Sequence, residues 1–289
     1  MIETIFSLGF LAQLIRISLP YALSAMGGSI TERAGVIDLA LEAKLLFGAF
    51  FAAAFAHATG SAFAGVLGGM CAGVAVTGIQ LFCALKLRAD QVIVGIALNV
   101  IALGGTRFLL QLVYHEGANS PQVPGFGHAL LVNPIVWLTL VAAVALPFAI
   151  KHTRWGLRLR AAGDRPEALT AVGVPSHRPR IFAALIGGAL TGAGGAQLTL
   201  SVGGFVADMS GGRGYIALAM VILAGWRPAI AALACAGIAF GEAFNIALQV
   251  SGVGIPHELA QLAPYVLTLA VLAIAGGKRD RTPKSLGKV

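Results

Sequence analysis

The sequence predicts an all-α membrane protein, a polytopic helix bundle of about nine spans, and composition and patterning both support this. Of the 289 residues, 57% are hydrophobic and 11% are charged, and the mean hydropathy is +0.85. Soluble domains carry about 25% charge, so a soluble globule is excluded. Lipid accepts only helices and closed barrels, and the alternation typical of barrel strands is absent from this sequence. The 38 glycines fit membrane helices whose backbones approach closely.

Each predicted span needs about 20 mostly apolar residues. The first has Glu3 and no basic residue before its apolar run, so it lacks the n-region of a cleaved signal peptide and is expected to remain as a span. The second span, 45–58, is allowed to begin before its apolar run. The seventh span, 215–225, is too short to cross a membrane alone. The candidates are residues 5–30, 45–58, 62–85, 91–113, 131–150, 181–202, 215–225, 229–250 and 262–275.

The basic residues predict the orientation of these spans. Residues 151–180 hold seven of the 20 Lys and Arg residues, and residues 278–289 hold five more. The loops 115–128, 203–212 and 251–261 contain none. Because basic loops stay in the cytoplasm, we expect the N-terminus outside and the C-terminus inside. The net charge of +8 is then explained by topology, and no nucleic-acid partner is expected.

Two pairs of segments resemble each other. Gly27 to Thr31 (GGSIT) is similar to Gly187 to Thr191 (GGALT), and residues 92–105 are similar to residues 215–225. In the expected topology the members of each pair run in opposite directions, which predicts inverted repeats with a transport pathway between them. The alternative is coincidence in a chain rich in Gly, Ala and Ile.

The segment between the first two spans places five charges among apolar residues: Glu32, Arg33, Asp38, Glu42 and Lys44. This pattern predicts a broken or re-entrant helix, which a membrane protein tolerates where the segment is buried in protein or lines a water-filled cavity. Asp38 and Glu42 are four residues apart and are expected on one helical face. Their charges either pin a turn or contact a solute, and the sequence leaves both roles open.

Polar residues inside spans are costly, and therefore mark candidate pathway residues. Arg107 lies two turns beyond Asn99, and Glu242 lies three residues before Asn245. Interhelical hydrogen bonds worth about 1 kcal/mol each are the alternative role for such side chains. The predicted substrate-pathway residues are Glu32, Asp38, Glu42, Asn99, Gln197 and Asn245.

The basic segment 151–180 contains a second candidate site. Asp164 is expected to cap a short helix that has Pro166 and Glu167 in its first turn and ends near Gly173. Its exposed apolar residues would dock into a partner's groove or lie on the membrane surface. The predicted docking residues are Asp164, Arg165, Pro166, Glu167, Ala168, Leu169 and Thr170.

No catalytic constellation is apparent in the sequence. His257 and Glu258 are not followed by the second His of a zinc-protease helix, and no Gly-rich phosphate loop is present. Three cysteines in apolar runs do not form a disulfide framework. We therefore expect no enzyme activity, no metal and no cofactor in this chain, with energy supplied by a partner or an ion gradient.

The segment that begins at Gly27 resembles a known protein family. The stretch GGSITERAGVIDLALEAKLLFGAFFA is similar to the signature of ABC-importer permeases of the branched-chain amino acid, simple-sugar and nucleoside superfamily. Nucleoside-type members carry Thr-Glu-Arg-x-Gly-Val-x-Asn-Ile-x-Leu-Glu-Gly. This chain departs from that pattern at Asp38, where Asn is common, and at Ala43 and Lys44, where Gly and an apolar residue are common.

Two further motifs extend the resemblance over residues 27–241. The family's W-G-x-x-x-R-A-x-G-x-x-x-x-A-A pattern forms the coupling helix that docks into the ATPase subunit. This chain resembles it at Trp155, Gly156, Arg160, Ala161, Gly163, Ala168 and Gly173, with Leu169 in place of the second Ala. A G-x-G-[FY]-x-A-[IL]-A pattern and a following Trp-Pro turn match residues 211–219 and 225–228.

The resemblance implies one permease domain over residues 1–289, with a cytoplasmic coupling loop at 151–180 and a basic cytoplasmic tail at 278–289. It implies a multi-pass protein of the bacterial cytoplasmic (inner) membrane, in contact with membrane lipid. Its implied partners are an ABC ATPase subunit that binds ATP and Mg, a second permease subunit of different sequence, and an extracytoplasmic substrate-binding protein. The implied substrate is a nucleoside, followed by simple sugars. An ion-coupled secondary transporter and a membrane-embedded enzyme are the other classes considered.

Overall fold

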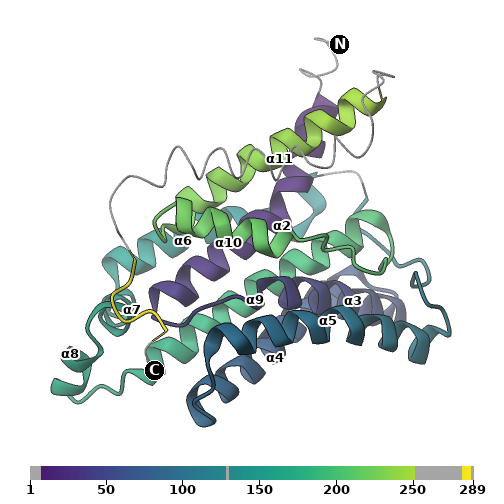
Figure 1. The fold of residues 1–289 in the computed structure, drawn as a ribbon. Helices are drawn as coiled ribbons and strands as arrows, with labels where there is room; N and C mark the ends of the chain where they lie inside the picture. Colours follow the sequence, from purple (N-terminus) through teal and green to yellow (C-terminus); the bar gives the residue numbers. More distant parts are fainter. Residues whose placement is uncertain (1–7, 128–129, 251–281, 288–289) are drawn as a thin grey trace.

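The computed structural model describes residues 8–127, 130–250 and 282–287 (Figure 1). These residues form helices and no strand, apart from one isolated bridge between Asn119 and Val206, so the all-α fold class is confirmed for them. The helices are α2 (Leu8–Arg33), α3 (Leu41–Thr59), α4 (Ala62–Leu81), the π-helical turn η1 (Phe82–Lys86), α5 (Gln91–Tyr114), the 3-10 turn η2 (Leu130–Val132), α6 (Pro134–His152), α7 (Arg154–Asp164), α8 (Pro166–Ala171), α9 (His177–Val202), α10 (Arg213–Leu223) and α11 (Pro228–Val250).

Within the described residues, six helices are long and apolar enough to cross a membrane: α3, α4 with η1, α5, α6, α9 and α11. The expected nine spans are therefore not confirmed. Helix α10 is short, as expected, and α2 has 26 residues but is not among the six. The ninth expected span, 262–275, lies outside the described residues.

Several helix ends follow from their capping residues. Helix α3 begins at Leu41, earlier than its apolar run, and ends at Thr59. The next residue, Gly60, has φ 66°, the left-handed conformation that glycine adopts without strain. Asp90 accepts hydrogen bonds from Val92 N and Ile93 N at the start of α5. Asn133 caps α6 in the same way, so that helix starts at 134 rather than at 131.

Helix α9 lies at the centre of the bundle. It packs against α2 on one side and against α3 and α4 on the other (Figure 1). Small residues allow these contacts, because a Cβ atom at Gly48 of α3 would lie only 2.7 Å from the carbonyl oxygen of Gly192. A Cβ atom at Gly188 would lie 2.7 Å from the carbonyl oxygen of Gly73 in α4. The glycine content therefore serves close helix packing here.

The two GGxxT segments cross each other. A Cβ atom at Gly27 would lie 2.5 Å from the carbonyl oxygen of Gly187, and one at Gly187 would lie 2.7 Å from the carbonyl oxygen of Gly27. Gly194 approaches Pro20, so α2 and α9 run antiparallel at this crossing. In each segment the threonine hydroxyl donates to the first glycine's carbonyl. These contacts are reciprocal, as a two-fold relation would require, but inverted repeats over the whole chain stay a prediction.

The predicted break in the helix is present between α2 and α3. Residues 34–40 are non-helical, and Gly35 has φ 98°. Asp38 lies within this connection, whereas Glu42 lies in the first turn of α3. The expectation that they share one helical face is wrong, because the chain turns between them.

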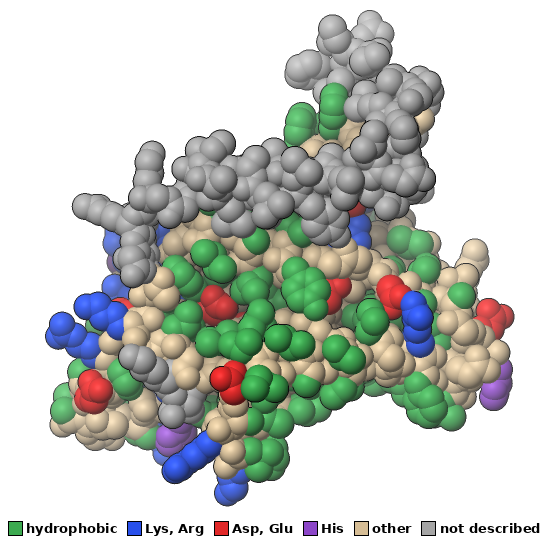
Figure 2. Space-filling model, viewed as in Figure 1, with side chains coloured by type: hydrophobic (Ala, Val, Ile, Leu, Met, Phe, Trp, Pro, Cys, Tyr) green, Lys and Arg blue, Asp and Glu red, His purple; other side chains and the backbone are tan. Residues whose placement is uncertain are grey.

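The outer faces of the bundle are apolar. Figure 2 shows hydrophobic side chains over much of the visible surface, with most of the visible Lys and Arg side chains towards its ends. On α5, for example, Ile93, Val100 and Phe108 are 68%, 66% and 65% exposed. Exposed apolar faces on long helices are typical of a protein whose solvent is lipid.

Candidate functional site

Glu42 connects the helix break to α10. Its carboxylate accepts hydrogen bonds from Gly212 N at 2.8 Å and from Gly214 N at 2.7 Å. Both amides belong to the start of α10, where backbone N–H groups lack helical partners and the helix dipole is positive. A Cβ atom at Gly214 would lie 2.6 Å from the Cα atom of Glu42, so this position needs glycine. Glu42 is 8% exposed, and its carboxylate satisfies the first turn of another helix.

Glu32 connects the end of α2 to the turn between α10 and α11. One carboxylate oxygen accepts from Trp226 Nε1 at 2.7 Å, and the other accepts from Asp38 N at 3.3 Å. Arg33 Nη1 donates to the Trp226 carbonyl oxygen at 3.2 Å. Two residues at the end of α2 are therefore hydrogen-bonded to Trp226, and one of them, Glu32, also accepts a hydrogen bond from the backbone of the break.

Asp38 and Lys44 form an ion pair within the break. The distance between Lys44 Nζ and Asp38 Oδ1 is 2.5 Å, and both side chains are 0% exposed. These are two of the positions where the chain departs from the nucleoside-type signature. The two departures are therefore compensating, because a buried charge requires a partner.

Asn99 of α5 holds the backbone on either side of the start of α3. Its Oδ1 accepts from Ala43 N at 2.9 Å, and its Nδ2 donates to the Leu39 carbonyl oxygen at 2.9 Å. The same Nδ2 lies 3.1 Å from the Tyr215 hydroxyl of α10. Asn99 thus links three elements around the break.

The remaining predicted pathway residues lie elsewhere. Gln197 of α9 is 1% exposed and accepts a hydrogen bond from Asn133 at 2.8 Å. Asn245 of α11 accepts from Gln249 in the same helix at 2.7 Å. Arg107 lies on α5 with Asn99, but its side chain forms an ion pair with Asp208 in the loop before α10.

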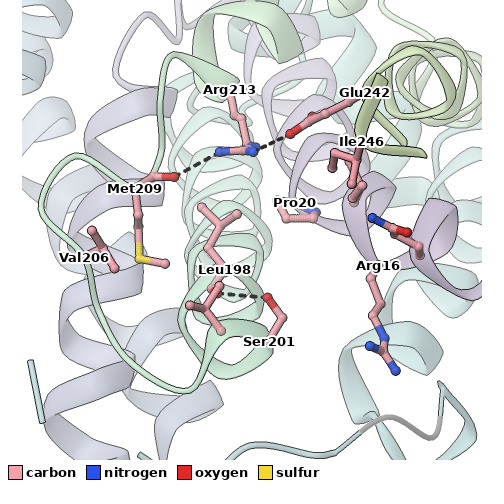
Figure 3. Close-up of a pocket in the computed structure, with 12 residues that line it drawn as sticks. Arg16, Pro20, Leu198, Ser201, Val206, Met209, Arg213, Glu242 and Ile246 are labelled. Atoms are coloured by element: carbon pink, nitrogen blue, oxygen red, sulfur yellow. Dashed lines mark hydrogen bonds and ion pairs between the residues drawn. The ribbon is translucent and has the colours of Figure 1, made fainter. Parts of the chain in front are cut away.

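A cavity of about 400 Å³ lies between α2, α9, α10, α11 and the connection before α10 (Figure 3). Arg213 crosses its upper side, with Nη1 donating to the Met209 carbonyl oxygen at 3.0 Å and Nη2 lying 2.6 Å from Glu242 Oε1. The Tyr21 hydroxyl donates to the other Glu242 oxygen at 2.9 Å. Polar and apolar groups share the lining: Gln13, Arg16, Ile17, Pro20, Leu198, Ser201, Val202, Val206, Met209, Arg213, Glu242 and Ile246.

None of the six predicted pathway residues lines this cavity; four surround the break, and their pathway role stays a prediction. The sequence reading noticed Glu242 but did not include it among the site residues, and it missed Arg213 and Tyr21. One signal was available: Arg213 is a lone cation at the end of a loop otherwise free of Lys and Arg, in a chain where unpaired charges are costly.

The predicted docking helix differs in its details. Asp164 ends α7 instead of capping the next helix, and Arg165 occupies the cap position of α8 without a side-chain hydrogen bond. Helix α8 has six residues and is followed by Gly173 at φ 73°. Ala168 is exposed, but Leu169 is only 5% exposed, so the expectation that Leu169 is one of the exposed apolar residues is wrong.

Helix α7 covers the Trp155 to Gly163 motif, and it connects α8 to the helix break. Gly156 packs against Ile150 of α6, and Gly163 packs against the Arg33 carbonyl at the end of α2. Arg180 Nη2 donates to the Ala162 carbonyl oxygen at 3.1 Å. The two glycines of the Trp-Gly motif are therefore positions where another backbone approaches closely.

The C-terminal segment 282–287 closes this region. Ser285 N and Ser285 Oγ both donate to the Gly163 carbonyl oxygen, at 2.8 Å and 2.6 Å. Gly287 N donates to the Gly35 carbonyl oxygen at 3.0 Å. The tail is thus hydrogen-bonded to both the end of α7 and the helix break, which no sequence motif indicated.

Within the described residues, no group of three His, Cys, Asp or Glu side chains could hold a metal ion. Cys71, Cys83 and Cys235 are free. The described site is therefore built from ion pairs, hydrogen bonds and close glycine contacts.

Several known proteins are similar to this chain over most of its length. The guanosine ABC transporter permease protein NupQ of Bacillus subtilis (strain 168) is 32% identical over 295 residues, covering 93% of this chain and 92% of its own length. The nucleoside ABC transporter permease protein NupC of Lactococcus lactis subsp. cremoris (strain MG1363) is 30% identical over 293 residues, covering 92% of each chain. The putative glucose ABC transporter permease protein TsgC13 of Haloferax volcanii is 30% identical over 305 residues, covering 93% of this chain and 92% of its own. No solved structure matches the chain.

A family model matches residues 10–272, which include the helix break, the cavity and the α7–α8 segment. The chain therefore belongs to the family described as "Branched-chain amino acid transport system / permease component".

Proposed function

We propose that this chain is a permease subunit of an ATP-driven importer and provides the membrane pathway for a nucleoside. The names of the relatives NupQ and NupC support the substrate class, and the match over more than nine tenths of each chain supports the same subunit role. In this proposal an ABC ATPase binds ATP and Mg, a second permease chain completes the pathway, and an extracytoplasmic protein delivers the solute.

The observation that carries the proposal is the cavity around Arg213 and Glu242. Its volume of about 400 Å³ falls in the range of about 300–1,000 Å³ typical of small-molecule sites. A nucleoside has a flat base, which suits the apolar lining, and ring nitrogens and ribose hydroxyls, which suit charged and amide side chains. Arg213 and Glu242 are 24% and 20% exposed, so both remain accessible to a solute.

The contacts of α7 suggest how ATP hydrolysis reaches the pathway. We propose that α7, α8 and the tail face the cytoplasm, as the basic residues of 151–180 and 278–289 indicate. Movement of α8 by the ATPase would be carried by α7 to the Arg33 carbonyl and the break, where Gly163 is in direct contact. From the break, Glu42 reaches α10, whose first residue is Arg213 in the cavity.

Uptake of labelled guanosine by cells that carry the complete transporter tests the substrate class. The proposal expects unlabelled nucleosides to compete and glucose or arabinose not to compete. Competition by the sugars alone would instead indicate a sugar substrate. Two relatives are named as sugar permeases: TsgC13 and an L-arabinose permease protein of Azospirillum brasilense.

Substitution of Glu242 tests the cavity within the same assay. Glu242→Gln keeps the shape of the side chain but removes the charge that pairs with Arg213. We expect the KM for guanosine to rise by about tenfold, which corresponds to the loss of one charged hydrogen bond. Glu116→Gln, in an exposed loop, is the matched control. Equal KM values for Glu242→Gln and wild type would exclude the cavity from the pathway.

A further inference from the structure

A second cavity, of about 440 Å³, lies at the opposite end of α2 from the Arg213 cavity. It is formed where the last turn of α2, the α7–α8 junction, the turn between α10 and α11, and the C-terminal segment meet. Its charged lining residues are Arg33, Arg165, Arg227, Lys284 and Asp164. Four cations and one carboxylate converge here, in a chain with only 11% charged residues.

The four cationic side chains of this second cavity form no ion pairs with the other residues that the structure describes. Arg33 is fixed in place by its Nη1 hydrogen bond to the Trp226 carbonyl, and it lies within electrostatic range of Arg160, Asp164 and Arg227. A guanidinium has five N–H donors, so Arg33 keeps donors for a ligand.

We propose that this cavity binds a phosphate group, either a soluble phosphate compound or the headgroup of an anionic lipid. Guanidinium groups bind phosphate through paired N–H donors, and an excess of about three positive charges favours an anion that carries more than one negative oxygen. A basic pocket between helices near the cytoplasmic surface is also the setting in which lipid phosphates bind. The walls are preformed, because Trp226 is 7% exposed and Pro283 is buried.

The site also has a structural consequence. Arg227 belongs to the α10–α11 turn, and Lys284 belongs to the segment that is hydrogen-bonded to Gly163 and thus to α7. A phosphate held between them would join the α10–α11 turn to the tail and α7. The proposal is independent of the transported solute, since none of the lining residues belongs to the Arg213 cavity.

The full-length chain, purified with any partner subunits that stay bound, tests this proposal in nanodiscs. One arm uses phosphatidylcholine discs titrated with sodium phosphate, with sodium chloride at equal ionic strength as the reference. The other arm compares discs that contain phosphatidylglycerol with neutral discs, without added phosphate. The thermal unfolding midpoint is measured for wild type, Arg227→Gln, Lys284→Gln and the control Arg178→Gln, all at exposed positions.

We expect the wild-type midpoint to rise in at least one arm, because a ligand that binds only the folded state stabilises it. A rise only with soluble phosphate, or only with phosphatidylglycerol, identifies the source of the phosphate. Arg227→Gln and Lys284→Gln should weaken the apparent affinity by about tenfold, and Arg178→Gln should not. No rise for wild type in either arm, or an equal loss in Arg178→Gln, would overturn the proposal.

Discussion

At the scale of single residues, four buried charged side chains of the described part of the chain lie around the helix break and have partners there. Glu32, Asp38, Glu42 and Lys44 are 8% exposed or less, and each is paired with a charge, an indole or backbone amides. Removing a charged group from water is costly, so each of these pairs restricts the conformation of the break. The sequence predicted that charges would gather here, but it could not predict their partners, which lie up to 194 positions away.

The Asp38–Lys44 pair gives the sharpest test at this scale. Lys44→Met alone should lower the free energy of unfolding by about 3–5 kcal/mol, because it leaves Asp38 buried without a counterion. Adding Asp38→Asn, which restores the residue common in the nucleoside-type signature, should recover most of that loss. Chemical unfolding in detergent measures both, with Lys151→Met at an exposed position as control. Asp38→Asn alone is measured as well; if its loss and that of Lys44→Met simply add in the double variant, the charges are not coupled.

Glu42→Gln tests the link between the break and α10. The amide nitrogen of Gln would face the Gly212 or Gly214 N–H group, so one hydrogen bond would be replaced by two opposed donors, at a cost of about 1–3 kcal/mol. We expect transport to fall more than the yield of assembled protein. Uptake and size-exclusion profiles of the same preparation distinguish the two effects. Loss of folded protein with unchanged transport per assembled complex would show that Glu42 only stabilises the fold.

At the scale of elements, helix positions could be predicted from apolar runs, but their details depended on tertiary contacts. Helices α4, α5 and α9 lie where the runs predicted them, because each is a long apolar segment with glycine or capping residues. Helix α7 has no long apolar run, and only the resemblance of Trp155 to Gly163 to a family motif indicated a helix there. It is stabilised by the Thr153 cap and by Gly163 packing on the end of α2.

The crossing of α2 and α9 can be tested with glycine substitutions. Gly27→Ala would place a Cβ atom 2.5 Å from the Gly187 carbonyl oxygen and should destabilise the fold by about 1–3 kcal/mol. Gly78→Ala in α4 has no atom within 4 Å of its new Cβ and should leave stability unchanged or raise it by up to about 1 kcal/mol. Thermal unfolding of both variants compares them directly. Similar midpoints would mean that this crossing tolerates separation of the helices.

Helix α8 is the element proposed to contact the ATPase. Ala168 is exposed and Leu169 is buried, so Ala168→Asp changes the surface without disturbing the contacts of α8. We expect Ala168→Asp to abolish co-purification of the ATPase, since it places a charge in the proposed interface, while the folded chain remains in the membrane. Ala118→Asp is the control, because Ala118 is exposed in the loop that follows α5 and is not part of α8. Undiminished co-purification of the ATPase with Ala168→Asp would refute the docking role of α8.

At the scale of the whole molecule, α2 joins the two cavities. Gln13 lines the Arg213 cavity and Arg33 lines the phosphate cavity, and at 1.5 Å per residue the helix between them is about 30 Å long, the thickness of a bilayer core. Composition therefore predicted the membrane class, and motifs predicted the family, but the cavity residues emerged only from helices packed together.

The central claim is that this chain imports a nucleoside with energy from ATP. Proteoliposomes that contain the permease, its second permease chain and the ATPase, supplied with the binding protein and labelled guanosine, test it most directly. The account predicts accumulation that requires ATP on the side of α7 and α8 and persists when the proton gradient is collapsed. Accumulation that continues without the ATPase and stops when the proton gradient is collapsed would contradict it and identify a secondary transporter.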